Sequence, residues 1–222
     1  METITQIPSS IEQIAKCTIW RWHEFLCEYP VTTMDRDKIL FQEIKTLRTS
    51  PILRFYRWNK PCLSYGRTAK LDLATELECR ANHLEMVRRP TGGGKVLHEN
   101  DLCFSLIWKK EDQEIPWKIN DSYCAIHQWI QQTMIQCGIE SKLKEIEPSP
   151  NIQSNWCFNN PVRFDLISQE KKLVGGAQFR DQSTALHQGS IQIQFKEDPL
   201  EFFQKSFENF FKIKLNVYSA AD

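Results

Sequence analysis

The sequence is poor in glycine, which makes each of its glycines informative. It has 222 residues and 8 glycines, about half the number expected at a typical usage of about 7%. They are Gly66, Gly92, Gly93, Gly94, Gly138, Gly175, Gly176 and Gly189. Because glycine costs backbone entropy on folding, a chain short of it should keep glycine clusters where the backbone bends sharply or approaches a ligand.

Other absences exclude several classes of protein. The 28 basic side chains balance the 28 acidic ones, so no net charge attracts the chain to nucleic acid or to anionic lipid. The sequence has no run of about 18 apolar residues, and its start, Met1-Glu2-Thr3-Ile4, lacks the basic and apolar regions of a signal peptide. We therefore expect a cytoplasmic protein whose partners include neither nucleic acid nor a membrane.

The eight cysteines lack the spacing of a metal site. They stand at positions 17, 27, 62, 79, 103, 124, 137 and 157, and no two are separated by the two to four residues of a zinc ribbon or a thioredoxin motif. Without a signal peptide, we expect most of them to be reduced and buried. No metal site is predicted.

Hydrophobic periodicity and turn residues predict mixed strands and helices. Strands are expected over 18–25, 52–58, 62–65, 84–87, 102–108, 163–168, 173–179 and 185–195. Helices are expected from Thr32 or Thr33 to Pro51, over 72–83, from a cap at Asn120 or Asp121 to Gly138, and after Asp198-Pro199. Residues 148–161 read as a long polar loop. The strands 52–58 and 62–65 are separated by Asn59-Lys60-Pro61, as in two strands joined by a turn. Several strands are such hairpin neighbours, so we predict one α+β domain over 1–222, with largely antiparallel sheets flanked by helices.

The densest local signal is Arg88-Arg89-Pro90-Thr91-Gly92-Gly93-Gly94-Lys95-Val96-Leu97-His98. Successive glycines expose backbone N–H groups that can form an anion-binding concavity, and Arg88, Arg89 and Lys95 add positive charge. The segment is neither a Walker loop nor a dinucleotide fingerprint. We predict that it binds a phosphate or a carboxylate; the alternative is a flexible surface hairpin with solvated arginines.

A second glycine cluster follows a pair of lysines in Lys171-Lys172-Leu173-Val174-Gly175-Gly176-Ala177-Gln178. A lysine on a strand that leads into two glycines can lie beside a ligand held against that backbone, as a point charge and donor. The alternative is a solvated turn, because charged clusters usually face water. Two glycine clusters beside cations together favour one binding site.

These blocks resemble the lipoate-protein ligase and octanoyltransferase family, which is related to the biotin-protein ligases. Arg54-Phe55-Tyr56-Arg57-Trp58-Asn59, Leu63-Ser64-Tyr65-Gly66 and His187-Gln188-Gly189-Ser190 support the resemblance, in the family's order, over about residues 30–196. It implies the family's catalytic-domain fold and the attachment of an octanoyl or lipoyl group to one lysine of a lipoyl carrier domain. The implied partners are lipoyl domains of 2-oxoacid dehydrogenases or the H protein of glycine cleavage, and acyl carrier protein as a donor.

The resemblance also implies site residues. Lys172 matches the lysine that contacts the activated acyl carbonyl, and Gly175 and Gly176 would let the acyl tail pass close to the strand. The implied substrate-binding residues are Arg89, Thr91, Gly92, Gly93, Gly94, His98, Gly175, Gly176, Ala177, His187 and Gly189. From the residues themselves, an apolar acyl tunnel suits the apolar strands, and one cation at its mouth can stabilise charge on the carbonyl oxygen.

Two ways of activating the acyl group stay open. Ligases form an acyl-adenylate from ATP and Mg²⁺, whereas some transferases take octanoate from acyl carrier protein through a cysteine thioester; neither route needs a permanently bound cofactor. Cys157-Phe158-Asn159-Asn160-Pro161, followed by Phe164-Asp165-Leu166, resembles the nucleophile segment of the cysteine transferases. A neighbouring Lys172 would favour the nucleophilic thiolate there.

Other features divide between these routes. Gly94 makes a triple glycine, the more ligase-like form, but the chain is too short for the accessory domain of long lipoate ligases. Biotin ligation is disfavoured because no Gly-Arg-Gly-Arg type of loop is present. Lys172 and Cys157 are therefore the candidate catalytic residues, with ligation and thioester transfer equally open. A non-catalytic module that binds carrier domains or an acyl ligand is the third hypothesis.

Overall fold

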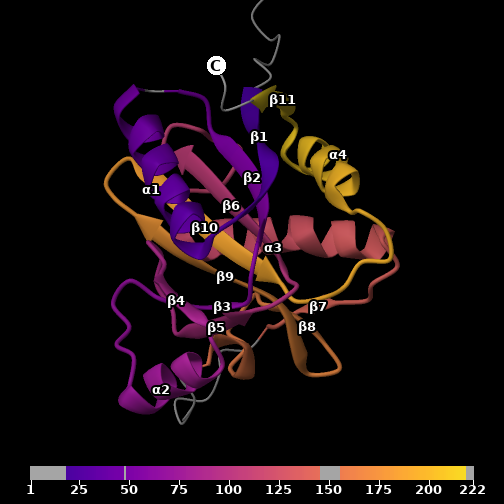
Figure 1. Ribbon diagram of the computed structural model, residues 1–222. Coiled ribbons are helices and arrows are strands. Elements are labelled where there is room, and N and C mark those ends of the chain that lie inside the picture. Colours follow the sequence, from indigo (N-terminus) through magenta and orange to yellow (C-terminus); the bar gives the residue numbers. More distant parts are fainter. Residues whose placement is uncertain (1–18, 48, 146–155, 219–222) are drawn as a thin grey trace, which may run out of the picture.

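Two β-sheets organise the structure (Figure 1). The computed structural model describes residues 19–47, 49–145 and 156–218. The large sheet contains, in spatial order, β11 (Lys214–Tyr218), β1 (Ile19–Glu28), β2 (Ile52–Trp58), β6 (Leu102–Lys109), β10 (Thr184–Ile191), β9 (Lys171–Arg180), β8 (Leu166–Ser168) and β7 (Lys142–Leu143). The small sheet contains β4 (Glu85–Arg88), β3 (Cys62–Tyr65) and β5 (Lys95–His98). Strand β1 runs parallel to β11 and β2, and β3 parallel to β4, whereas the other neighbours are antiparallel.

Helices flank these sheets. Those in the described part of the chain are α1 (Pro30–Leu47), α2 (Leu73–Ala81), α3 (Ile119–Gln136) and α4 (Leu200–Phe211). A short 3-10 turn, η1 (Cys157–Asn159), precedes β8. The small sheet and α2 lie together at the lower end of the view in Figure 1. The predicted α+β class, with largely antiparallel sheets, is confirmed.

The alternation of side chains along the strands gives the large sheet two different cores. On one face, Phe104 packs against Trp129 of α3, with ring centroids 6.1 Å apart. On the other, the register partners Ile107 and Leu186 pack with Ile44 of α1. Burying such a side chain contributes about 1.5–3 kcal/mol, so helices are held on both faces of the sheet.

Most predicted elements are present with small shifts at their ends, but the predicted cap of α3 is wrong. The helix begins at Ile119 after Lys118, which makes no side-chain capping bond. Asp121 lies in the first turn, where its negative charge is favourable near the helix N-terminus. Gly138 follows the last turn with φ +75°, a conformation that suits glycine, so the predicted helix stop is confirmed.

The segments 52–58 and 62–65 are strands, but they do not pair with each other as their spacing suggested. Strand β2 already pairs with β1 on one side and β6 on the other, so it has no free edge for β3. Asn59-Lys60-Pro61 instead leads the chain from the large sheet to the small one. The strands β5 and β11 were not expected from the sequence.

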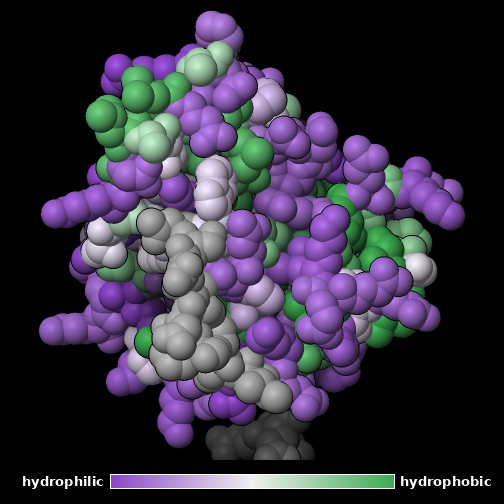
Figure 2. Space-filling view, turned by 90° about the horizontal axis from the view of Figure 1, so that it is seen from below, coloured by the Kyte–Doolittle hydropathy of each residue, from purple (hydrophilic) through white to green (hydrophobic). Residues whose placement is uncertain are grey.

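The seven cysteines in the described part of the chain are unpaired, as expected. The expected burial holds only for Cys62, Cys79 and Cys103, because Cys124, Cys137 and Cys157 are half-buried and Cys27 is exposed. Cys17 and positions 148–155 of the predicted polar loop lie outside the described residues. None of the described helices is both long and apolar enough to cross a membrane. Seen from below, the molecule presents mainly hydrophilic residues, with hydrophobic residues gathered toward two edges of the view (Figure 2).

Candidate active site

A cavity of about 380 Å³ lies between the large and the small sheet, a size typical of small-molecule sites. Tyr56, Cys103, Ser190 and Gly175 are successive register partners across β2, β6, β10 and β9, so they line one side of it as a row. The small sheet and η1 supply the facing side. The lining is mostly apolar, as the expected acyl pocket requires.

Lys172 is held in the cavity wall by a buried carboxylate. Its Nζ lies 2.8 Å from Oδ2 of Asp165, which is fully buried, and donates to the backbone carbonyl of Cys157 at 3.3 Å. A Cβ at Gly175 would lie 2.1 Å from Cε of Lys172. Gly175 therefore makes room for the lysine side chain.

A tyrosine on α3 completes this ion pair. The Tyr123 hydroxyl donates to Oδ1 of Asp165 at 2.7 Å and accepts from the Gly176 N–H at 2.9 Å. Burial, followed by the Asp165 charge, raises the pKa of Tyr123 well above its usual value. The network fixes the Asp165 carboxylate, and through it the ammonium group of Lys172.

The sulfur of Cys157 is held by the first glycine cluster and not by Lys172. Its Sγ accepts the backbone N–H of Gly94 at 3.0 Å, and the Arg89 guanidinium lies beside it. A Cβ at Gly93 would lie 3.2 Å from Nη2 of Arg89 and 3.5 Å from this sulfur, so the three groups surround one point. Lys172 does neighbour Cys157, as expected, but its ammonium group donates to the carbonyl of that residue and not to its sulfur.

The loop at 90–94 is folded around Arg89. Nη2 of Arg89 donates to the carbonyls of Gly92 and Gly94, at 3.0 Å each, and only 7% of the residue is exposed. Burial lowers the pKa of Arg89, and the neighbouring Cys157 partly offsets that shift. A Cβ at Gly66 would lie 2.0 Å from the Gly93 carbonyl oxygen, so the loop packs tightly on β3. The surface-hairpin alternative is wrong.

The other two cations of this motif point elsewhere. Arg88 is exposed and donates to the carbonyls of Arg67 and Ala69. Lys95 is buried against Thr75, at 2.6 Å, and Asp72, at 3.3 Å. Of the three expected cations, Arg89 alone lines the cavity.

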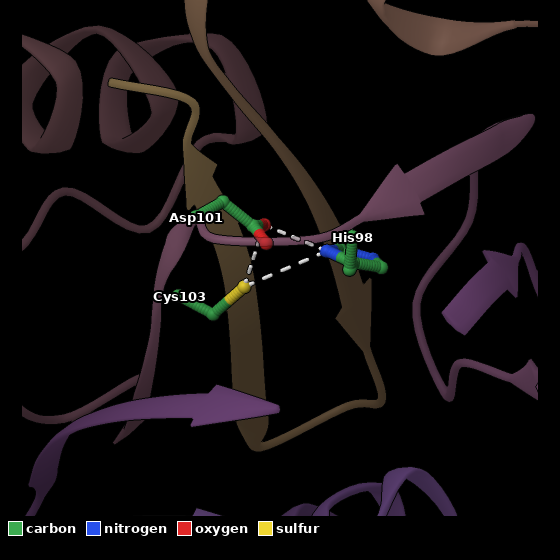
Figure 3. A group of neighbouring side chains, drawn as sticks. All are labelled: His98, Asp101 and Cys103. Atoms are coloured by element: carbon green, nitrogen blue, oxygen red, sulfur yellow. Dashed lines mark hydrogen bonds and ion pairs between the residues drawn. The ribbon is translucent and has the colours of Figure 1, made fainter. Parts of the chain in front are cut away.

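His98, Asp101 and Cys103 form a buried group (Figure 3), of which His98 and Cys103 line the cavity. Nδ1 of His98 lies 2.7 Å from Oδ2 of Asp101, and the Cys103 thiol donates to the same oxygen at 3.1 Å. Burial raises the pKa of Asp101, but the imidazole of His98 and the hydrogen bonds that the carboxylate accepts outweigh it, so the net shift is downward.

This group also has the composition of a metal site, since its three ligand atoms lie within 4.8 Å of one another. Two ligands of a tetrahedral zinc ion stand about 3.3 Å apart, because each bond is about 2.0–2.1 Å long. The His98–Asp101 distance of 2.7 Å is that of a hydrogen bond. The side chains satisfy one another, and we assign them no metal.

The structure brings most of the expected site residues together. Those that line the cavity are Arg89, Gly93, Gly94, His98, Cys157, Lys172, Gly175, Gly176, Ala177 and Gly189. Gly92 contributes its carbonyl to Arg89, and Thr91 is fully buried, with its hydroxyl donating to Gln188 at 2.7 Å. Gly92 and Thr91 therefore support the loop from outside the cavity.

His187 does not line the cavity, contrary to the prediction that it binds the substrate. Because it alternates with Gln188 along β10, it faces the opposite side of the sheet, where its ring stacks on Phe104. Burial lowers its pKa well below the usual range. A Cβ at Gly176 would lie 2.4 Å from Nε2 of His187. The missing side chains of Gly175 and Gly176 therefore also leave room for Lys172 and His187.

Sequence reasoning missed four residues of the site: Ser64, Asp101, Tyr123 and Asp165. Two of them lie inside quoted blocks, Ser64 in Leu63-Ser64-Tyr65-Gly66 and Asp165 in Phe164-Asp165-Leu166. A polar residue between apolar neighbours on a predicted strand was the available signal, although Asp165 comes just before β8. Nothing in the sequence around Tyr123 indicates that its hydroxyl reaches β9.

The model of the lipoyl protein ligase A/B catalytic domain matches residues 29–214. The chain belongs to this family. The octanoyltransferase LipM of Oceanobacillus iheyensis is 33% identical over 187 residues, which cover 83% of this chain and 68% of that protein. LipM of Bacillus subtilis is 32% identical over 189 residues, covering 82% and 68%. The resemblance seen in the motifs is confirmed, and the chain is an acyl-transferring enzyme of protein lipoylation.

Solved structures show the same fold. A lipoate-protein ligase A bound with ATP superimposes with a TM-score of 0.68 at 17% identity, covering 91% of this chain and 88% of that one. The bipartite lipoate protein ligase of Thermoplasma acidophilum, studied with its E2 lipoyl domain, gives 0.64 at 17% identity, covering 91% and 87%. At these identities the likeness concerns the fold alone.

Proposed function

We propose that the enzyme transfers an octanoyl group from acyl carrier protein to a lysine of a lipoyl domain, by way of a thioester on Cys157. The observation that carries this proposal is the position of the sulfur, which lines the apolar cavity, accepts from the Gly94 N–H and lies beside the Arg89 guanidinium. A cysteine beside a cation and a backbone donor is suited to act as a thiolate nucleophile. The octanoyltransferase relatives support the same route.

The proposed reaction has two balanced steps. The Cys157 thiolate attacks the carbonyl carbon of the octanoyl thioester, a new C–S bond forms, and the thiolate of the carrier protein leaves. The acceptor lysine then attacks the acyl-enzyme as a neutral amine. An amide bond forms, the C–S bond to Cys157 breaks, and the amine loses one proton to solvent as the thiolate returns.

The remaining residues of the cavity have roles in this scheme. The Lys172 ammonium lies in the wall beside Cys157, where it would stabilise negative charge on the acyl carbonyl oxygen in both steps. Gly175, Gly176, Ala177 and Gly189 line the apolar part that would hold the octanoyl chain. The acceptor would be a lipoyl domain of a 2-oxoacid dehydrogenase or the glycine cleavage H protein, in keeping with the E2 lipoyl domain of the Thermoplasma ligase.

The experiment uses the intact mass of both proteins. The enzyme is incubated with octanoyl-acyl carrier protein and then with an apo lipoyl domain; a parallel reaction contains lipoate, ATP and Mg²⁺. We expect one octanoyl group on the wild-type enzyme, its passage to the lipoyl domain, and neither product with Cys157→Ala. Cys124→Ala, a half-buried cysteine on α3 away from the cavity, serves as the matched control. Modification that survives Cys157→Ala, or that occurs only with ATP, would overturn the thioester route in favour of ligation.

A further inference from the structure

A continuous series of hydrogen bonds leads from Asp101 to Arg89, whose guanidinium lies beside the sulfur of Cys157. Nδ1 of His98 donates to Asp101 at 2.7 Å, which leaves Nε2 to accept the Ser64 hydroxyl at 2.6 Å. The Ser64 oxygen in turn accepts from Nη1 of Arg89 at 2.8 Å. Every hydrogen bond in this series is donated in the same direction, from Arg89 toward Asp101, and the series begins at the guanidinium beside Cys157.

All four residues of this hydrogen-bond series are buried. Asp101, His98, Ser64 and Arg89 are 5%, 3%, 0% and 7% exposed. They come from three places, namely the turn before β6, the small sheet and the loop after β4. Arg89 is held in one orientation, because its Nη1 donates to the Ser64 hydroxyl and its Nη2 donates to the carbonyls of Gly92 and Gly94.

Arg89 is a buried cation without a carboxylate partner among the described residues. Its direct partners are a hydroxyl and two carbonyls, all neutral, and Asp101 is separated from it by His98 and Ser64. An unpaired buried charge is costly. Three groups near it in the described part of the chain can ionise, namely Cys157, Tyr56 and Cys103. Burial raises the pKa of Tyr56 and of Cys103 well above the usual range, so the thiol of Cys157 is the one left to carry a negative charge.

The other charged and titratable groups near this sulfur are already engaged. Lys172 of β9 pairs with Asp165, which precedes β8, at 2.8 Å. The Tyr123 hydroxyl of α3 donates to the same carboxylate. The lysine's positive charge is thus largely balanced at its own ion pair, whereas that of Arg89 is not.

We propose that the Cys157 thiolate is the counter-ion of Arg89, and that Asp101, His98 and Ser64 are positioning residues that keep the guanidinium against the sulfur. The assignment rests on the proposed function, in which Cys157 is the nucleophile. It gives the two cations different roles, since Arg89 stabilises the thiolate and Lys172 is left for the acyl carbonyl oxygen.

The first test measures the thiolate without any acyl donor, so its result is independent of whether octanoyl transfer occurs. The ultraviolet absorbance of the thiolate is taken at neutral pH as the difference between each variant and the same variant carrying Cys157→Ala. The rate of Cys157 alkylation by iodoacetamide is followed by mass in parallel. We expect Ser64→Ala to lose most of the absorbance and to react about tenfold more slowly, because a hydrogen bond to a charged group is lost.

Two further variants separate positioning from general damage. Ser64→Thr keeps the hydroxyl and should restore both signals. Ser105→Ala is the control. It removes a different fully buried hydroxyl, which donates to the Asp37 carboxylate at 2.9 Å, and it should leave both signals unchanged. Equal thiolate signals in Ser64→Ala and the wild type would overturn the proposal, even if the acyl-enzyme forms.

A second test does not depend on the folding of the Ser64 variants. Cys157→Asp supplies a permanent negative charge near Arg89, and Cys157→Asn supplies a neutral side chain of the same shape. If Arg89 requires an anion, Cys157→Asp should unfold at a higher temperature than Cys157→Asn. An equal or lower melting temperature for Cys157→Asp would show that Arg89 needs no counter-ion there.

Discussion

Lys172 contacts the backbone of Cys157 and not its sulfur: its Nζ donates to the Cys157 carbonyl oxygen at 3.3 Å, whereas the sulfur accepts from the Gly94 N–H and lies beside Arg89. The same ammonium group lies 2.8 Å from the buried Asp165 carboxylate. A lysine fixed between a carboxylate and a carbonyl keeps its charge at the cavity without touching the nucleophile. The site therefore has two cations in two distinct positions.

Replacing Lys172 with Met should lower acyl transfer to the lipoyl domain at least about 100-fold, because one preorganised donor in a buried site contributes about that much. It should also lower the free energy of unfolding by about 3–5 kcal/mol, since Asp165 would lose its ion pair. The double variant Lys172→Met/Asp165→Asn should recover stability in urea unfolding but not transfer. Lys171→Met changes the exposed neighbouring lysine and is the control. Near wild-type transfer by Lys172→Met would exclude this role of Lys172.

Replacing Gly175 with Ala should impair transfer by displacing Lys172, because the new Cβ would lie 2.1 Å from Cε and 2.3 Å from Nζ of the lysine. We expect at least a tenfold loss in the transfer rate, since a displacement of about 1 Å can cost about 100-fold. Gly138→Ala is the matched comparison. Its φ of +75° strains alanine, so it should cost about 1 kcal/mol of stability and leave the transfer rate unchanged. Equal transfer rates in the two variants would argue against the displacement.

Replacing Arg54 with Met should lower the free energy of unfolding by about 3–5 kcal/mol. Nη1 of Arg54 lies 2.6 Å from Oδ1 of Asp37, and both side chains are fully buried, so the variant leaves a carboxylate without its cation. Lys38→Met breaks an exposed ion pair with Asp35 and should cost less than about 1 kcal/mol. Chemical denaturation of both variants checks the contrast, and a similar small loss in the two would disprove it.

His127 should make the protein less stable as the pH falls from about 6.5 to about 4. Burial lowers the pKa of His127 to about 4, whereas the unfolded chain binds this proton below about 6.5. Unfolding thus takes up a proton in this window, and the free energy of unfolding decreases by as much as about 3 kcal/mol across it.

His127→Gln tests this pH dependence. Glutamine can still donate to the Phe164 carbonyl, which Nδ1 of His127 contacts at 2.8 Å, but it cannot titrate. Urea unfolding at several pH values should show a flatter dependence for His127→Gln than for the wild type, whereas the exposed His83→Gln should follow the wild type. Identical slopes for His127→Gln and the wild type would contradict the assignment.

Local patterns predicted the elements well because they depend on neighbouring residues. The apolar period of 119–134 and the glycine at 138 fixed the main helix, and the run 52–58 is the strand β2 within the same bounds. The cap of α3 failed because its start is decided by tertiary packing and not by the nearest Asn or Asp. The hairpin of 52–58 with 62–65 failed because other strands occupy both edges of β2.

The sequence by itself determined the chemistry available: two glycine clusters, the cations beside them, and Cys157 in a nucleophile-like segment. Only the tertiary structure decided which groups meet. Side-chain alternation on β10 turned His187 away from the cavity, and chain segments far apart in the sequence brought Arg89 to the sulfur and Lys172 to Asp165. Residue type follows from the sequence, but the partner of a buried charge depends on how distant segments pack, because the low-dielectric interior makes each such charge dependent on its immediate neighbours.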